Sequence, residues 1–161
     1  MHARSSGSLI IYLSLFFSMC LSIIPLVNPI AALMPSWTLL TLMYWSIALP
    51  HKVSIGTGWV TGLLFDVLSG SMIGQHALIF STTTFFSHKL YSRLRNYRVW
   101  QQAIFILFFL LLMRLLSLWI SQLNYPLEPD YRYWLQVFIS ALCWPLIFSI
   151  LRLVRRHFRV Q

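Results

Sequence analysis

The sequence predicts an all-α polytopic membrane protein with about six transmembrane helices and both termini in the cytoplasm. Of its 161 residues, 58% are hydrophobic and only 9% are charged, and the mean hydropathy is +0.74. Apolar segments recur along the whole chain, and a helix of about 20 such residues crosses a hydrocarbon core of about 30 Å. A chain with so little polar surface does not form a soluble domain. We therefore treat residues 1–161 as a single integral membrane domain.

Six apolar segments are long enough to be considered as spans, and we expect them at 9–27, 30–49, 53–69, 75–89, 101–123 and 134–151. The first follows Arg4 and ends near Pro25. Its apolar stretch is longer than the core of a secretory signal, and no small-residue cleavage site follows it, so we expect it to remain in the protein.

The middle segments carry prolines and glycines at their ends. The second segment has Pro35 near its start, where a missing N–H is tolerated, and stops at Pro50. Because its core is short, it either tilts or is partly re-entrant before Pro35. The third and fourth segments are joined by a tight turn that Gly70 and Gly74 permit. Five spans remain the main alternative, if the second or fourth segment does not cross fully.

The last two segments are the most apolar part of the second half of the chain. The fifth, 101–123, contains a single charge, Arg114. The sixth carries Pro145, which we expect to kink the helix near its cytoplasmic end.

The distribution of Lys and Arg predicts the orientation. Ten of the twelve basic residues fall on one side: Arg4, Lys52, Lys89, Arg93, Arg95, Arg98, Arg152, Arg155, Arg156 and Arg159. The opposite side has only Arg132, in a loop with Glu128 and Asp130. Cytoplasmic loops retain basic residues, so this pattern places both termini inside, and we expect a multi-pass protein of an inner membrane.

The net charge of +9 does not indicate a nucleic-acid partner, because the basic residues lie at span ends and no folded domain presents them. Contact with anionic lipid head groups accounts for them.

Cys20 and Cys143 lie within apolar segments, where packing is their expected role. We find no metal-ligand spacing, phosphate-binding loop or nucleophile motif. We therefore expect neither enzymatic activity nor a cofactor.

Two ionisable residues lie inside predicted spans. Asp66 and Arg114 each fall 13 residues after the cytoplasmic start of a span, which is a similar depth of roughly 20 Å. An isolated charge at that depth costs about 2.5–3.5 kcal/mol or more, so it usually has a partner. We predict that the two approach each other directly or through water. In the alternative, Ser69 caps Asp66 or Asp66 is protonated, and Arg114 extends outward.

Small residues recur every four positions around Asp66. They are Ser54, Gly58, Gly62, Gly70 and Gly74. Residues at this spacing lie on one helix face, where another backbone can approach closely. The row predicts either internal helix packing or a groove for the helix of another protein.

The order of these motifs resembles a known family. The segment from Pro35 to Gly74 contains PSWTLLTLMYW, LPHK, GTG and GLLFDVLSG, and WQQ at 100–102 and CWP at 143–145 follow. This arrangement resembles the MreD family of rod shape-determining proteins, in its enterobacterial type, over nearly the whole chain. The resemblance implies a fold similar to the six-helix substrate-binding components of vitamin transporters.

The resemblance also implies a function and partners. It implies a non-enzymatic scaffold or regulatory subunit of the cell-wall elongation complex. The expected partners are an MreC-like protein with one span and, through it, the MreB filament, a polymerase of the SEDS type and its transpeptidase. The alternative is a small-molecule binding component of a transporter, with a polar pocket around Asp66 and Arg114.

Overall fold

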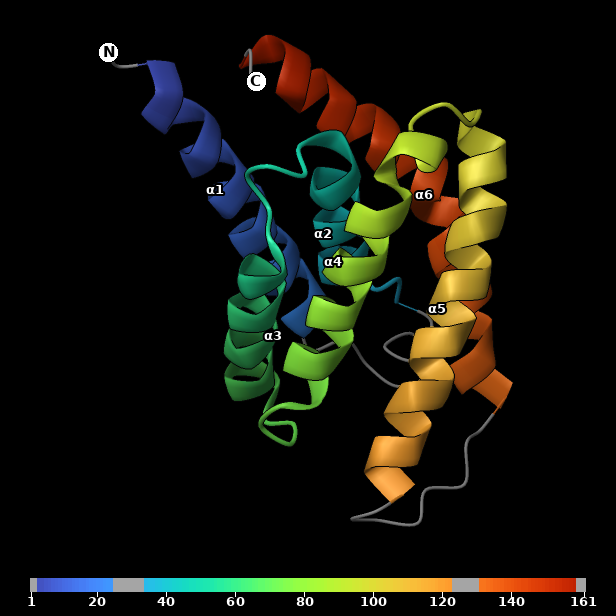
Figure 1. Cartoon of the computed structure of the whole chain (residues 1–161). Helices are drawn as coiled ribbons and strands as arrows, with labels where there is room; N and C mark the ends of the chain where they lie inside the picture. The colour runs from blue at the N-terminus through green and yellow to red at the C-terminus, as the bar shows by residue number, and fades with distance from the viewer. Residues whose placement is uncertain (1–2, 25–33, 123–130, 159–161) are drawn as a thin grey trace.

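The computed structural model describes residues 3–24, 34–122 and 131–158, and these are helical apart from short connections. The helices in chain order are α1 (Ala3–Ile23), α2 (Trp37–Ala48), α3 (Ile55–Ser69), α4 (Gln75–Leu94), α5 (Val99–Gln122) and α6 (Tyr131–His157). They pack into one bundle, in which α1 begins and α6 ends at the same end (Figure 1). The prediction of an all-α protein is confirmed.

Helix α2 forms the centre of the bundle. It contacts α1, α4 and α6, and every residue from Thr38 to Ile47 is buried. Trp45 is fully buried, and its indole N–H donates a hydrogen bond of 2.8 Å to Ser14 on α1. The sequence of this segment, which carries no charge and is mostly apolar, is thus explained by a helix enclosed by its neighbours.

The helix boundaries differ from several of the predicted spans. Helix α1 covers 3–23 where 9–27 was expected, and residues 25–27 lie outside the described residues. The second span was expected at 30–49, but α2 begins only at Trp37, and residues 30–33 lie outside the described residues. Pro35 lacks an amide hydrogen and disfavours a helical residue before it, so the helix starts after it. Helix α4 continues to Leu94, beyond the expected 75–89, and α6 covers 131–157 without a break at Pro145.

Large apolar side chains cover the outside of the bundle. Phe17, Ile104, Trp119 and Leu142 are each at least 68% exposed. A surface of this kind is stable against lipid and unfavourable in water. By length and composition, two described helical segments are able to span a membrane, Val99–Ile120 and Tyr131–His157. The chain is therefore an all-α membrane protein, and the number of six spans remains a prediction.

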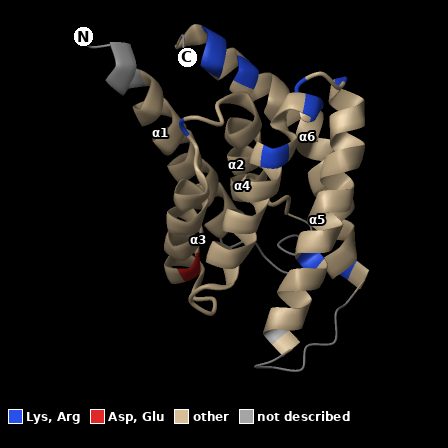
Figure 2. Ribbon diagram, in the orientation of Figure 1, with Lys and Arg blue, Asp and Glu red and all other residues tan. Residues whose placement is uncertain are grey.

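Charged residues are unevenly distributed along the bundle (Figure 2). Most Lys and Arg residues lie toward the end that holds both chain termini, whereas Asp66 is near the far end of α3. Within the described residues, this asymmetry agrees with the positive-inside pattern read from the sequence.

Candidate functional site

Asp66 anchors the turn between α3 and α4. Its side chain is fully buried, and its carboxylate accepts hydrogen bonds from the backbone N–H groups of Gly74 (2.8 Å) and His76 (3.0 Å). The Ser71 hydroxyl donates a third at 2.8 Å, and His76 Nδ1 donates a fourth at 2.7 Å. The carboxylate thus caps the start of α4, where backbone N–H groups lack helical partners.

Two glycines make this turn possible. Gly70 ends α3 with φ at 65°, and Gly74 precedes α4 with φ at 103°. Both angles lie in the left-handed region, which glycine adopts at little cost. The predicted tight turn at these residues is confirmed, and it brings the N-terminus of α4 over Asp66.

Arg114 on α5 has a different environment. Its Cζ atom lies 3.3 Å from the ring centroid of Tyr133, so the guanidinium stacks on this aromatic face. The Nε atom is buried and has no hydrogen-bond partner. The ion pair that the described residues form is between Asp66 and His76 rather than between Asp66 and Arg114. The described residues thus show no direct ion pair between Asp66 and Arg114, and an approach through water, the other form of the prediction, stays a prediction.

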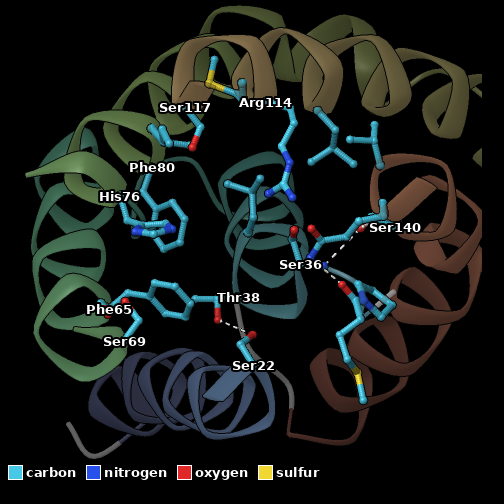
Figure 3. Close-up of a pocket in the computed structure, with 18 of the residues that line it drawn as sticks. Ser22, Ser36, Thr38, Phe65, Ser69, His76, Phe80, Arg114, Ser117 and Ser140 are labelled. Atoms are coloured by element: carbon cyan, nitrogen blue, oxygen red, sulfur yellow. Dashed lines mark hydrogen bonds between the residues drawn. The ribbon is translucent and has the colours of Figure 1, made fainter. Parts of the chain in front are cut away.

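A cavity of about 350 Å³ nevertheless connects the two neighbourhoods. Arg114 lines it from α5, and Ser71 and His76, the partners of Asp66, line it from the α3–α4 turn. Figure 3 shows the Arg114 side chain extending into the space between the helices, toward Ser36 and Ser140. All six helices or their flanking residues contribute to its walls.

Hydrogen bonds hold the polar part of the cavity wall in place. The Ser22 and Thr38 hydroxyls are 3.0 Å apart, linking α1 to α2. The backbone N–H of Ser36 donates to Ser140 Oγ at 3.1 Å, linking the start of α2 to α6. The remaining wall is largely apolar: Leu39, Phe65, Ile79, Phe80, Leu110, Met113 and Val137. The cavity is therefore mixed in character, with a polar side near α2 and α6.

Two glycines from the row of small residues, Gly58 and Gly62, face α4 rather than an outside partner. A Cβ atom at Gly58 would lie 2.6 Å from Thr84 Oγ1, and one at Gly62 would lie 2.5 Å from Ala77 N. Internal packing, one of the two alternatives, is thus what the structure shows for these two glycines. Ser54 precedes α3 as an exposed N-cap residue.

The structural roles of two residues, His76 and Gln102, were not predicted from the sequence. His76 was not predicted to be the partner of Asp66. Gln102 is buried, and its side-chain amide donates to the carbonyls of Leu94 (2.9 Å) and Tyr97 (3.2 Å). Its Oε1 accepts a hydrogen bond from Trp144 Nε1 at 3.3 Å, so it joins the α4–α5 connection to α6. The sequence feature that could have indicated this role is the position of Gln102, a polar residue directly after Gln101 at the start of an apolar segment.

Other polar side chains of the bundle have local roles. Thr83 and Thr84 are buried and donate to the carbonyls of Ile79 and Phe80, one helical turn earlier. Cys20 and Cys143 are free thiols. The described residues contain no group of three His, Cys, Asp or Glu side chains that could hold a metal ion. The arrangement offers a binding cavity between the helices, next to a hydrogen-bonded cluster at Asp66 in which Ser71 Oγ lies 3.2 Å from His76 Nδ1.

The fold and the site define a helical membrane protein with an internal cavity that is polar on one side. The family model described as rod shape-determining protein MreD matches residues 3–154. The rod shape-determining protein MreD of Haemophilus influenzae is 37% identical over 132 residues, which cover 80% of each chain. This chain therefore belongs to the MreD family and has a role in determining rod shape. No solved structure matches it.

Proposed function

We propose that this protein is a non-enzymatic scaffold or regulatory subunit of the bacterial cell-wall elongation complex. The match to the MreD family over residues 3–154 carries this proposal. The architecture supports it, because the described residues form a helical bundle with short connections, and such a bundle acts through its lipid-facing surface. The comparisons give no support to the alternative of a transporter component.

The proposed location is the bacterial inner membrane, with several crossings and both termini in the cytoplasm. The common end at which α1 begins and α6 ends, together with the Lys and Arg residues gathered there, supports this orientation. Reporter fusions to each terminus test it. A phosphatase that functions only outside the cytoplasm should be inactive on either end, and activity on one end would contradict the orientation.

The proposed direct partner is an MreC-like protein with one transmembrane helix. Through it, the subunit would connect to the MreB filament, the SEDS-type polymerase and its transpeptidase. Membrane lipids surround the complex, and no nucleic acid takes part. In this assembly, Asp66 fixes the α3–α4 hairpin and thereby the surface that the partner meets.

The surface best suited to a single partner helix is a groove between α1 and α3. It measures about 800 Å³ and is lined by Leu9, Tyr12, Leu13, Leu15, Phe16, Met19, Gly56, Thr57, Val60, Thr61 and Leu64. Small residues at Gly56, Thr57 and Thr61 permit close approach of a second backbone, which drives helix association in lipid. Gly58 and Gly62 are not available to a partner, because α4 already covers them. We therefore propose the face of α3 that lines the groove as the partner surface.

Depletion of the protein in its host tests the function. We expect cells to widen into spheres while growth continues, as measured by microscopy over several generations, and wild-type protein should restore the rod. Cells that keep their width after depletion would contradict the proposal. Rods that stop growing until a nutrient is supplied in excess would indicate transport instead.

Disulfide crosslinking tests the groove. Val60 is 51% exposed and lies in the groove, whereas Leu142 on α6 is 73% exposed and lies outside it. In a background with Cys20 and Cys143 replaced by serine, Val60→Cys should crosslink to a cysteine in the partner helix, and Leu142→Cys should not. Equal crosslinking at both positions would contradict a specific contact at α1 and α3.

A further inference from the structure

The cavity between the helices concentrates positive charge without a matching anion among the described residues. Arg114 lies on its wall, and its buried Nε atom has no partner. The described ranges contain one acidic residue, Asp66, and its carboxylate is occupied by Ser71, Gly74 and His76. A cation in a membrane interior is unfavourable unless it is paired or hydrated. The cavity therefore has an unmet requirement for negative charge.

Helix α2 adds to this positive character. It begins at the cavity, and Pro35, Ser36 and Thr38 are part of the wall. The N-cap residue Ser36 makes no side-chain hydrogen bond to the first turn. The N-terminus of a helix carries partial positive charge and N–H donors, an arrangement that binds anions. Figure 3 shows Arg114 extending toward this point, from the opposite wall.

We propose that the cavity binds an oxyanion, the phosphate or carboxylate group of a lipid or of a free small molecule. The oxyanion lies between the Arg114 guanidinium and the first turn of α2. A planar guanidinium pairs with two oxygens at once, and stacking on Tyr133 fixes its orientation for this contact. The volume of about 350 Å³ lies within the range of small-molecule pockets. Ligand binding of this kind is separate from the proposed partner contact at α1 and α3.

The test uses the purified full-length protein in a neutral detergent. Phosphatidylglycerol, phosphatidylcholine and inorganic phosphate are titrated separately, with the melting temperature and native mass spectrometry as readouts. Stabilisation by phosphatidylglycerol together with a retained lipid identifies a lipid as the source of the oxyanion. Stabilisation by inorganic phosphate alone identifies a free anion. Stabilisation by neither anion, or an equal response to phosphatidylcholine, would overturn the proposal.

Three variants assign the effect to the cavity. Arg114→Gln should weaken binding about 10- to 100-fold, because it removes a charged hydrogen-bond donor. Arg132→Gln removes a cation that is not part of the cavity wall, and its binding should match that of the wild type. If Arg114→Gln does not fold, binding is measured with Arg114→Lys in its place, because this variant keeps the positive charge but loses the planar guanidinium group. Wild-type affinity in the arginine variant that folds would overturn the proposal.

The chain's own acidic residues provide the last control. Glu128 and Asp130 lie outside the described residues, and the double variant Glu128→Gln with Asp130→Asn removes both charges. We expect this variant to bind phosphatidylglycerol or phosphate with the affinity of the wild type. If only the double variant binds, the chain's own carboxylates occupy the site, and the proposal of an external ligand is wrong.

Discussion

The Asp66 carboxylate accepts a hydrogen bond of 2.7 Å from His76 Nδ1, across the turn that joins α3 to α4. The same carboxylate accepts backbone N–H groups from Gly74 and His76. One buried side chain in the last turn of α3 thus caps the start of α4. Because a buried carboxylate is costly unless its oxygens are paired, this arrangement makes Asp66 a determinant of the hairpin geometry.

Asp66→Asn should destabilise the protein by about 1–3 kcal/mol, since an amide group would face backbone N–H donors and leave them unpaired. The melting temperature in detergent measures the effect. Ser71→Ala is the matched control, because it removes only one of the hydrogen bonds that Asp66 accepts and should cost about 0.5–1.5 kcal/mol. An Asp66→Asn protein as stable as the wild type would contradict the assigned role.

Exchange of the two intramembrane charges should not restore the protein. Asp66→Arg combined with Arg114→Asp separates Asp66 from His76 and places an acid against Tyr133. We expect the double variant to accumulate in membranes at a level no higher than either single variant, measured by immunoblot. Recovery to the wild-type level would show that the two residues interact.

The effects of Asp66→Asn and His76→Ala on the free energy of unfolding, by contrast, should be non-additive by about 0.5 kcal/mol or more, since the two residues share one interaction.

Gly62→Ala should loosen the contact between α3 and α4. The added Cβ would lie 2.5 Å from Ala77 N and from His76 O, both of which are backbone atoms that a rotamer change cannot move. Overpacking of this kind costs about 1–3 kcal/mol, read as a lower melting temperature. Gly56→Ala is the matched control, because its Cβ would meet only Ser54 Oγ at 3.6 Å. Alanine there should be neutral or should stabilise by up to about 1 kcal/mol.

Gln102→Leu should destabilise the bundle by about 1–3 kcal/mol, because the Leu94 carbonyl and the Trp144 indole N–H lose their shared partner. The neighbouring Gln101 is exposed, and its side chain accepts only the N–H of Arg98. Gln101→Leu should therefore change the melting temperature much less. Equal effects at the two positions would show that the buried network does not matter for stability.

Local signals predicted the helices and the turn, whereas long-range pairing was not accessible. The apolar runs and the glycines at 70 and 74 act within a few residues, so the sequence alone was sufficient for them. The pairing of Asp66 with Arg114 was inferred from their similar depth along two helices. Depth does not determine the direction in which a side chain points around the helix axis, and His76 is closer because the turn returns the chain to Asp66.

The row of small residues shows the same limit. A spacing of four residues correctly indicates close packing on one face of α3, but it does not say which helix provides the contact. Gly58 and Gly62 meet α4, the next helix in the chain. Gln102 was missed for a related reason, since its burial depends on Trp144, which is 42 residues later in the sequence.

The enclosed position of α2 has a consequence for how the protein is made. Its residues from Thr38 to Ile47 are buried, and two of the helices that cover them, α4 and α6, follow it in the chain. With 12 residues, α2 is also only about 18 Å long, less than the hydrocarbon thickness. During synthesis, α2 therefore leaves the ribosome before α4 and α6 exist, and its final position depends on helices inserted later. Assembly of this bundle is completed only when the last helix, α6, has been released.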